Sequence, residues 1–180
     1  MTQRWIVTAL GKDRPGIVAG VTKILYQLGC NLEDSAMTRL EGEFAIMLIF
    51  SMGSKATEAQ LRKAFAPLER QLKLVVHLKP LSQMEAKTPH KQGRRHLISV
   101  YGGDRPGIVF RVSELLARAG VNITDVHTHR SSGTRSLYLL LLEVEVPPRV
   151  RMETVEERLR RLGKSVGVEV SVRSAEADVL

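Results

Sequence analysis

Residues 11–18 read Gly-Lys-Asp-Arg-Pro-Gly-Ile-Val, and residues 102–109 read Gly-Gly-Asp-Arg-Pro-Gly-Ile-Val. The two stretches are 91 positions apart in the chain. When residues 5–34 are compared with residues 96–125, twelve of the thirty positions are identical. A fixed internal period of this kind predicts that the chain consists of two copies of one structural module.

The repeated stretch lies between a strand pattern and a helix pattern in each copy. An apolar run precedes it at residues 5–10 and 96–101, which predicts a strand. Apolar residues then recur at helical spacing over residues 14–28 and at the same positions of the second copy, which predicts an amphipathic helix. The start of that helix presents unpaired N–H groups, which could hold a small anion such as a carboxylate.

The residue types in the stretch also suit the two ends of the helix. Asp13 and Asp104 are suited to the N-cap, and the prolines two positions later fall in the first turn, where a missing N–H costs little. Gly29 and Gly120 are predicted to end the two helices in the left-handed conformation. The same residue types would also make a plain tight turn, so spacing alone leaves a ligand-binding and a purely structural interpretation open.

The remaining elements follow the same order in both copies. In the first copy we predict a strand over 31–40, a turn at 41–43, a strand over 44–50, a helix with a capping box at 57–60, and a strand over 74–78. The run at 44–50 is continuously apolar, which predicts burial on both faces, and Pro67 is expected to kink or shorten the helix. In the second copy we predict a strand over 121–130, a turn at 131–134, a strand over 136–146, a helix with a capping box at 154–157 that is capped by Gly163, and a strand over 166–172.

Each half therefore has the order β-α-β-β-α-β. The predicted fold class is α+β, with two tandem ferredoxin-like domains, each an antiparallel sheet with helices on one face. We place the first domain at residues 1–79, a linker without a periodic apolar face at 80–94, and the second domain with a short C-terminal tail at 95–180.

Composition narrows the class of protein. The 180 residues carry a formal net charge of +8, and the basic excess is spread over the first module and the linker without forming one intense stripe. Cys30 is the only cysteine, which excludes an internal disulfide and a thiolate metal cluster. The start of the chain is unlike a secretory signal and no apolar run is long enough to span a bilayer, so we expect a cytoplasmic protein without membrane association.

The repeated motif, Gly-x-Asp-Arg-Pro-Gly followed by a helix and then Gly-x-Asn-[Leu/Ile]-x-Asp, resembles that of the ACT domain, a small regulatory module that typically binds amino acids. Two such domains in a short chain without an appended enzyme resemble the glycine cleavage system transcriptional repressor family. The loop motif is also similar to that of the regulatory domain of formyltetrahydrofolate deformylase, whose large catalytic domain has no counterpart here. The resemblance covers about residues 1–79 and 95–173.

The resemblance implies a ligand site between the first loop of one domain and the second strand of the other. Loop amides would take the carboxylate of an amino acid, and an Asn carbonyl or Asp carboxylate would take its ammonium group. The implied ligand-binding residues are Gly11, Lys12, Asp13, Gly16, Asn31, Asp34, Gly102, Asp104, Gly107, Asn122 and Asp125. The two copies differ at Lys12 and Gly103, so their sites need not be equivalent, and one or both could bind.

The function that the resemblance implies is a non-enzymatic amino-acid sensor. The favoured form is a glycine-responsive repressor or corepressor of the glycine cleavage system, acting through a protein partner such as a helix-turn-helix activator. The alternative is a detached regulatory subunit of an enzyme of amino-acid or one-carbon metabolism. The modules could pair within one chain, or their edge strands could pair across a homodimer.

Two other classes of function were weighed. An RNA-binding domain shares this strand order, but the third strands lack the stacking aromatics of that class and no helix-turn-helix motif is present, so we do not expect direct nucleic-acid binding. His127, His129 and Asp125 share one face of a predicted strand, which suits either a zinc site or, in the favoured interpretation, a polar strand face. We expect no catalytic residues, no metal and no cofactor.

Overall fold

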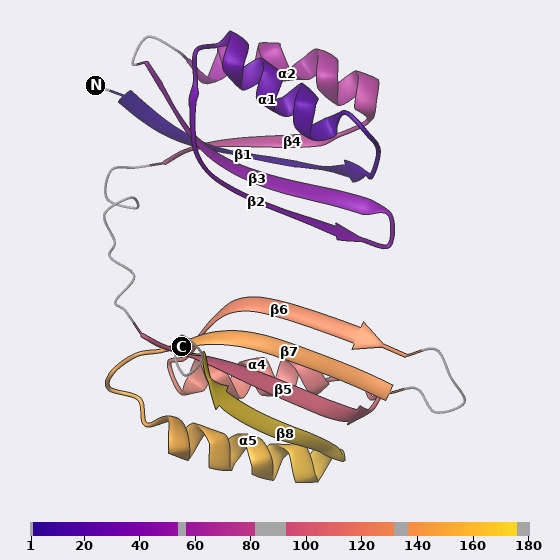
Figure 1. The fold of residues 1–180 in the computed structure, drawn as a ribbon, viewed down its shortest axis with the longest axis vertical. Helices are drawn as coiled ribbons and strands as arrows, with labels where there is room; N and C mark the ends of the chain where they lie inside the picture. The colour runs from indigo at the N-terminus through magenta and orange to yellow at the C-terminus, as the bar shows by residue number, and fades with distance from the viewer. Residues whose placement is uncertain (1, 54–56, 82–92, 132–136, 176–180) are drawn as a thin grey trace. The chain divides into compact units, whose positions relative to one another are not determined.

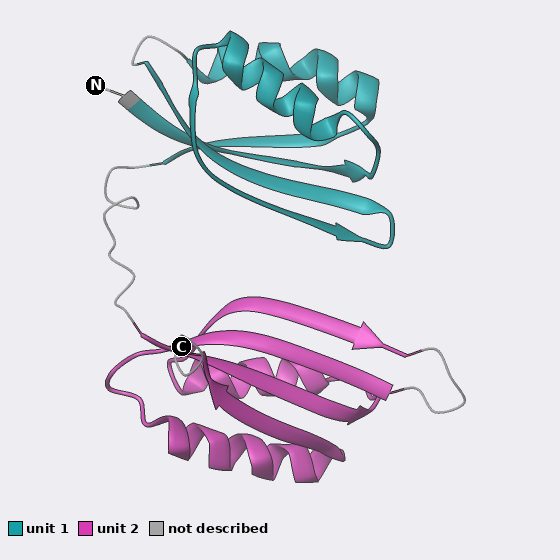
Figure 2. Cartoon of the chain, in the orientation of Figure 1, with its two compact units in different colours: residues 1–88 teal, residues 89–180 magenta. Residues whose placement is uncertain are grey.

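The computed structural model describes residues 2–53, 57–81, 93–131 and 137–175. The chain divides into two compact units, residues 1–88 (unit 1) and residues 89–180 (unit 2), shown in Figure 2. Each unit is a four-stranded antiparallel sheet with two helices on one face, as Figure 1 shows. The predicted fold class, α+β with two tandem βαββαβ units, is confirmed.

The elements of unit 1 follow the predicted order. They are β1 (Thr2–Lys12), α1 (Ile17–Gln27), β2 (Asn31–Leu40), β3 (Glu43–Gly53), α2 (Glu58–Leu72) and β4 (Val75–Leu81). The sheet order is β2-β3-β1-β4, so β2 and β4 form the edges. The two-residue turn between β2 and β3 has positive φ at both Glu41 and Gly42, which matches the twist of an antiparallel hairpin.

Unit 2 repeats this plan. Its elements are β5 (Arg94–Gly103), α4 (Ile108–Arg118), β6 (Asn122–Arg130), β7 (Leu137–Val146), α5 (Met152–Val166) and β8 (Val168–Ser174), with the sheet order β6-β7-β5-β8. Residues 132–134 of the predicted turn and most of the predicted linker lie outside the described residues. Within these bounds, the two units share one topology.

Each unit has its own core between the sheet and the helices. On β3 the buried residues alternate with exposed or half-buried ones: Phe44, Ile46, Leu48, Phe50 and Met52 face the helices, while Met47 is 49% exposed on the other face. The prediction that residues 44–50 are buried on both faces was therefore wrong, because the helices of the unit cover only one face of its sheet. A buried Phe or Leu stabilises the fold by about 1.5–3 kcal/mol.

The first helix of each unit begins later than predicted. The helices α1 and α4 begin at Ile17 and Ile108, three residues later than predicted, because Gly16 and Gly107 take the N-cap with φ of 97° and 91°. The predicted N-cap role of Asp13 and Asp104 was therefore wrong. The left-handed glycines after both helices, Gly29 and Gly120, are confirmed, with φ of 67° and 73°.

For the second helix of each unit, the predicted start is confirmed in α2 but not in α5. The capping box of α2 is confirmed: the Thr57 side chain accepts from the Gln60 N–H, and the Gln60 side chain accepts from the Thr57 N–H. The helix continues through Pro67 to Leu72, so it is not shortened. In α5 the predicted capping box and the Gly163 cap were both wrong, since the N-cap is Arg151 and the helix ends at Gly167.

Candidate functional site

The repeated loop is held by a close approach of backbone at its first glycine. A Cβ added to Gly11 would lie 2.8 Å from Leu74 Cδ2 and 3.1 Å from the Lys73 carbonyl oxygen. A Cβ added to Gly102 would lie 2.9 Å from the Gly167 carbonyl oxygen. The first glycine of each loop is therefore required for packing against the start of the last strand, whether or not it also meets a ligand.

The aspartate of each loop forms an ion pair with the second strand of its own unit. Arg39 Nη1 lies 3.3 Å from Asp13 Oδ2, and Arg130 Nε lies 3.1 Å from Asp104 Oδ2. The Asp13 N–H also donates to the Gly42 carbonyl, at 2.8 Å, which fixes the loop to the β2–β3 turn. The sequence interpretation missed both arginines, although the 91-residue offset that relates the loops also relates Arg39 to Arg130.

The start of the helix after each loop is open. Neither Gly16 nor Gly107 provides a side-chain hydrogen bond to the first turn, and the first helical hydrogen bonds run from Gly20 N–H to Gly16 and from Arg111 N–H to Gly107. A Cβ added at either N-cap glycine would have no atom within 4 Å among the described residues. The N–H groups of the first turn, at the positive end of the helix dipole, therefore have no side-chain cap, and the space beside the N-cap glycine is open.

In unit 1 this open space is a surface pocket of about 700 Å³. Its walls are the loop, the first turn of α1 and two side chains of the sheet, and they consist of Asp13, Arg14, Pro15, Gly16, Ile17, Val18, Ala19, Met37 and Phe44. Of the predicted ligand-binding residues, Asp13 and Gly16 line it, and Gly11 and Lys12 do not. The structure thus brings the loop and the far end of β2 together in one pocket.

The corresponding region of unit 2 is more polar. Strand register places Tyr138 opposite Gly102 and Arg130, where unit 1 has Phe44 opposite Gly11 and Arg39. Burial raises the pKa of the Tyr138 phenol, the nearby Asp104 carboxylate raises it further, and a hydrogen bond with the Thr128 side chain acts in the opposite direction. The two loop regions therefore differ chemically by a hydroxyl pair that unit 1 lacks.

The two asparagines lie at the opposite ends of the second strands from the loops. Asn31 begins β2 and Asn122 begins β6, and both are exposed. Eight residues of extended strand separate Asn31 from Arg39, a distance of roughly 26 Å. Within a single unit, the structure does not bring the asparagine and the loop together.

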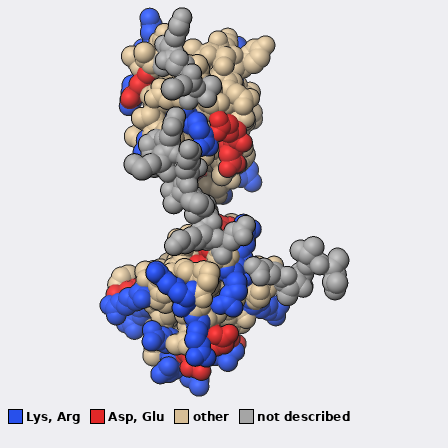
Figure 3. Space-filling model, turned by 90° about the vertical axis from the view of Figure 1, so that its left-hand side faces the viewer, with Lys and Arg blue, Asp and Glu red and all other residues tan. Residues whose placement is uncertain are grey.

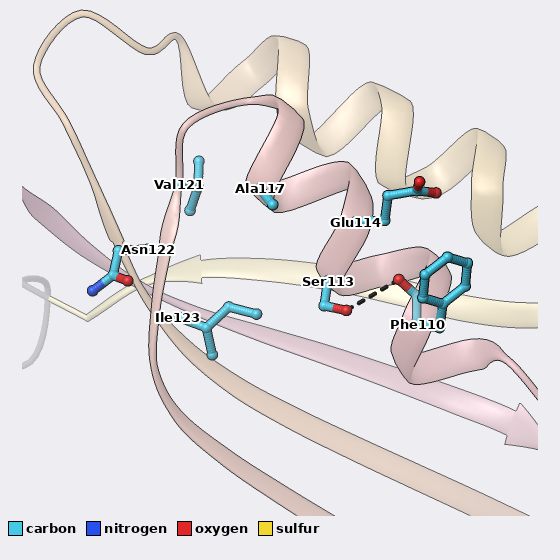
Figure 4. A pocket seen from close by; sticks show the side chains of 7 residues that line it. All are labelled: Phe110, Ser113, Glu114, Ala117, Val121, Asn122 and Ile123. Atoms are coloured by element: carbon cyan, nitrogen blue, oxygen red, sulfur yellow. Dashed lines mark hydrogen bonds between the residues drawn. The ribbon is translucent and has the colours of Figure 1, made fainter.

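Asn122 lines a shallow groove of about 490 Å³ between α4 and the start of β6, shown in Figure 4. The other residues that line it are Phe110, Ser113, Glu114, Ala117, Val121 and Ile123. The Ile123 side chain points toward α4, whereas the Asn122 side chain points away from it. The Asn122 amide is therefore presented outward, available to a group that does not belong to this helix.

Asp34 and Asp125 hold the irregular part of these strands. Each lies just after a register shift, and its Oδ1 accepts from the following N–H, of Ser35 at 2.7 Å and of Val126 at 2.8 Å. Asp125 Oδ2 also lies 2.9 Å from His127 Nε2. Both aspartates therefore stabilise the backbone at the register shift of their strand. The ligand contact predicted for them stays a prediction.

Other candidate sites are weakly supported. No group of three or more His, Cys, Asp or Glu side chains that could hold a metal ion occurs in the described part of the chain, and His127 is paired with Asp125. Burial raises the pKa of the Cys30 thiol, which lowers its reactivity. None of the helices among the described residues has the length and apolar character to cross a membrane.

The charges of unit 2 are unevenly distributed. On the face drawn in Figure 3, Lys and Arg side chains cover much of unit 2, and Asp and Glu side chains cover only a small part. A partner that approaches this face meets a positive surface.

Known proteins resemble this chain over one or both units. The family model of the ACT domain matches residues 3–79 and 94–173. The UPF0237 protein SMU_72 of Streptococcus mutans is 36% identical over 81 residues, which are 45% of this chain and 92% of that protein. The glycine cleavage system transcriptional repressor of Escherichia coli is 25% identical over 171 residues, which are 93% of this chain and 87% of that protein. A solved structure of a Galdieria sulphuraria protein has a TM-score of 0.82 and 25% identity and covers 97% of this chain and 99% of its own.

Proposed function

Because the chain belongs to the ACT domain family, with one domain in each of its two units, we propose that it is a non-enzymatic regulatory protein that senses a small amino acid, with glycine as the favoured ligand. The observation that carries this proposal is the repeated open helix start beside an Asp–Arg ion pair. Two loops that keep the same exposed N–H groups and the same ion pair are better explained by ligand binding than by packing.

The proposed binding mode follows from the charges of a zwitterion. The carboxylate accepts hydrogen bonds from the N–H groups at the start of α1 or α4, where the helix dipole favours an anion. Arg39 or Arg130 keeps a positive charge beside the loop, where it is paired with the loop aspartate. The ammonium group donates to the side-chain oxygen of Asn31 or Asn122 of a neighbouring domain, since the asparagine of the same domain is too far away.

The preference for glycine rests on two considerations. In unit 1 the pocket beside the loop is bounded by Met37 and Phe44, which gain nothing from a polar ligand side chain. The full-length relative in Escherichia coli is named for the glycine cleavage system. The more polar region of unit 2, with Thr128 and Tyr138, would accept a ligand with a hydroxyl group.

Regulation then requires the ligand to bind two states of the protein with different affinity. Ligand that joins two domains stabilises the joined state, and it shifts the equilibrium by no more than its preference for that state. We propose that the joined state differs in its affinity for a protein partner, so that the chain represses transcription indirectly, and that it works inside the cytoplasm.

The test is calorimetry of the full chain with each of the twenty amino acids. We expect glycine to bind. Arg39→Ala and Arg130→Ala should each weaken binding at the corresponding site about tenfold, as for a lost charge-assisted hydrogen bond. Asn31→Ala and Asn122→Ala should weaken glycine binding by unequal factors. Lys63→Ala, on the exposed surface of α2, is the matched control and should leave binding unchanged. Absence of heat from all twenty amino acids would overturn the proposal.

A further inference from the structure

The helical face of unit 2 carries a groove between α4 and α5. The groove has a volume of about 550 Å³ and is lined by Phe110, Arg111, Glu114, Leu115, Arg118, Arg158 and Leu162. Leu115 and Leu162 are half-buried and pack against the core of the unit. The Phe110 side chain is 64% exposed. The groove therefore has an apolar floor, an aromatic wall and three arginines.

The first unit provides an internal comparison for this groove. The offset of 91 relates α4 to α1, and the matching burial pattern relates α5 to α2 with an offset of 94. At the positions of Phe110, Arg111, Arg118 and Arg158, unit 1 has Ala19, Gly20, Gln27 and Ala64. The two helices of unit 1 also approach closely there, since a Cβ added to Gly20 would lie 2.6 Å from Leu68 Cδ1. Four small or neutral residues at one place correspond to one aromatic and three cationic residues in unit 2.

The arginines of the groove are only partly neutralised. Arg118 Nη2 lies 2.8 Å from Glu114 Oε1, within one helix. Arg111 and Arg158 form no ion pair with any residue that the structure describes. Figure 4 shows Glu114 pointing from α4 toward the side of α5, so its carboxylate is the one negative charge among the groove residues. The groove is thus positive at its rim and apolar at its floor.

This combination fits an amphipathic acidic helix. Such a helix would place a leucine or similar side chain over Leu115 and Leu162, and carboxylates beside Arg111 and Arg158. A nucleic-acid backbone would gain from the arginines but not from the leucine floor.

We infer that the groove between α4 and α5 is the docking site for an acidic amphipathic helix of a partner protein. The inference rests on the proposed function in one respect, that the chain acts through a protein partner. It does not depend on which amino acid binds, or on whether the loops bind one at all.

The experiment measures fluorescence anisotropy of a labelled synthetic helical peptide of about sixteen residues, with leucines along one face and glutamates elsewhere, mixed with the full chain at low salt. Two control peptides replace the glutamates by glutamines or the leucines by alanines. We expect the parent peptide to bind at least about tenfold more tightly than either control, because each control loses one of the two kinds of contact.

Variants of the full chain locate the binding. Phe110→Ala and Arg111→Gly together give α4 the residues of unit 1 and should weaken peptide binding about tenfold or more. Arg158→Ala should weaken it less, and Glu114→Gln should strengthen it by removing the negative charge. Arg160→Ala is the matched control on α5, because Arg160 lies outside the groove and is paired with Glu156; it should change little.

The inference is overturned if the parent peptide does not bind, if the glutamine peptide binds equally well, or if the Phe110/Arg111 double variant binds like the original chain. Tighter binding of a nucleic-acid duplex or single strand, lost in the same double variant, would also overturn it in favour of a nucleic-acid surface. Glycine calorimetry on the Arg158→Ala variant separates the two proposals. Arg158 lines the groove between α4 and α5 but not the groove that contains Asn122, so this variant should keep the glycine affinity of the original chain.

Discussion

Gly11, Gly102 and Gly103 are three loop glycines with different surroundings. A Cβ at Gly102 would meet the Gly167 carbonyl oxygen and the Val168 Cα at 2.9 Å, both backbone atoms that cannot rotate away. At Gly11 the nearest atom is the end of the Leu74 side chain, at 2.8 Å, which can move. At Gly103 no atom of the described residues lies within 4 Å.

The prediction from these distances is a graded series. Gly102→Ala should lower the free energy of unfolding by about 2–3 kcal/mol, Gly11→Ala by about 1–2 kcal/mol, and Gly103→Ala by less than about 0.5 kcal/mol, in line with the usual cost of overpacking. Urea denaturation followed by circular dichroism measures all three. Equal destabilisation of Gly102→Ala and Gly103→Ala would contradict the assigned packing role.

Tyr138 gives a prediction about pH. Burial and the Asp104 carboxylate raise the pKa of its phenol in the folded state above the value in the unfolded chain. The folded state therefore holds the proton more tightly, and this contribution to stability is fully present below pH of about 10 and is lost as pH rises through the folded-state pKa. Stability of unit 2 should fall above that pH.

The Tyr138→Phe variant restores the residue that unit 1 has at this position and removes the titrating group. Its stability should fall less between pH 9 and 11, as urea denaturation would show, and one tyrosine should disappear from the late part of the absorbance titration near 295 nm. Tyr26→Phe, at an 82% exposed position, is the control and should leave the stability profile unchanged. An identical fall in stability for Tyr138→Phe and the original chain would contradict the assignment.

At the scale of elements, the two second helices show which sequence signals are decisive. Thr57 and Thr154 both begin a pattern that resembles a capping box, but only Thr57 caps a helix. The difference lies in tertiary packing, because Met152 and Val155 are both buried and draw the helix start back to Met152. A local pattern predicts a cap only where the core does not require the helix to begin earlier.

Substituting each threonine by alanine tests whether it caps its helix. Thr57→Ala should lower the unfolding free energy by about 1 kcal/mol through loss of the cap. Thr154→Ala should change it by less than about 0.5 kcal/mol, since a surface position away from a cap has little effect. Thermal or urea denaturation distinguishes the two variants, and a larger effect at Thr154 than at Thr57 would contradict a capping role for Thr57 alone.

Much of the element order could be predicted from sequence because it depends on local periodicity. Gly29 and Gly120 were predicted correctly as left-handed ends, since a glycine directly after an apolar helical stripe has few other uses. Gly163 was not, because its role is the approach of α5 to β8: a Cβ there would lie 2.7 Å from the Val168 carbonyl oxygen. A contact between elements of this kind leaves no local pattern in the chain.

In the candidate site, too, local features could be predicted from the sequence and contacts between distant residues could not. The loops were found from their repeated residues, but the ion pairs of Asp13 with Arg39 and of Asp104 with Arg130 were not, because they depend on the register that brings the end of the second strand beside the loop. The sequence alone predicts Asp13 as a helix cap for the same reason. The side chain that it contacts lies 26 positions further along the chain.

At the scale of the whole molecule, each unit has a separate hydrophobic core. The first unit, expressed alone as residues 1–81, should therefore fold and show the circular dichroism of an α+β protein. At low concentration it should not bind glycine, because Asn31 and the loop of the same unit lie at opposite ends of β2. Calorimetry of this fragment beside the full chain is the measurement. Full glycine affinity in the dilute, monomeric fragment would contradict the proposal that two domains share one ligand.

Phe110 and Glu114 line both the groove that contains Asn122 and the groove between α4 and α5. A molecule bound in one groove and a molecule bound in the other would therefore both contact these two side chains. If binding in one groove changes the affinity of the other groove by some factor, binding in the other groove changes the affinity of the first by the same factor. An amino acid bound beside Asn122 and a partner helix bound between α4 and α5 would thus be coupled through the two side chains that they share.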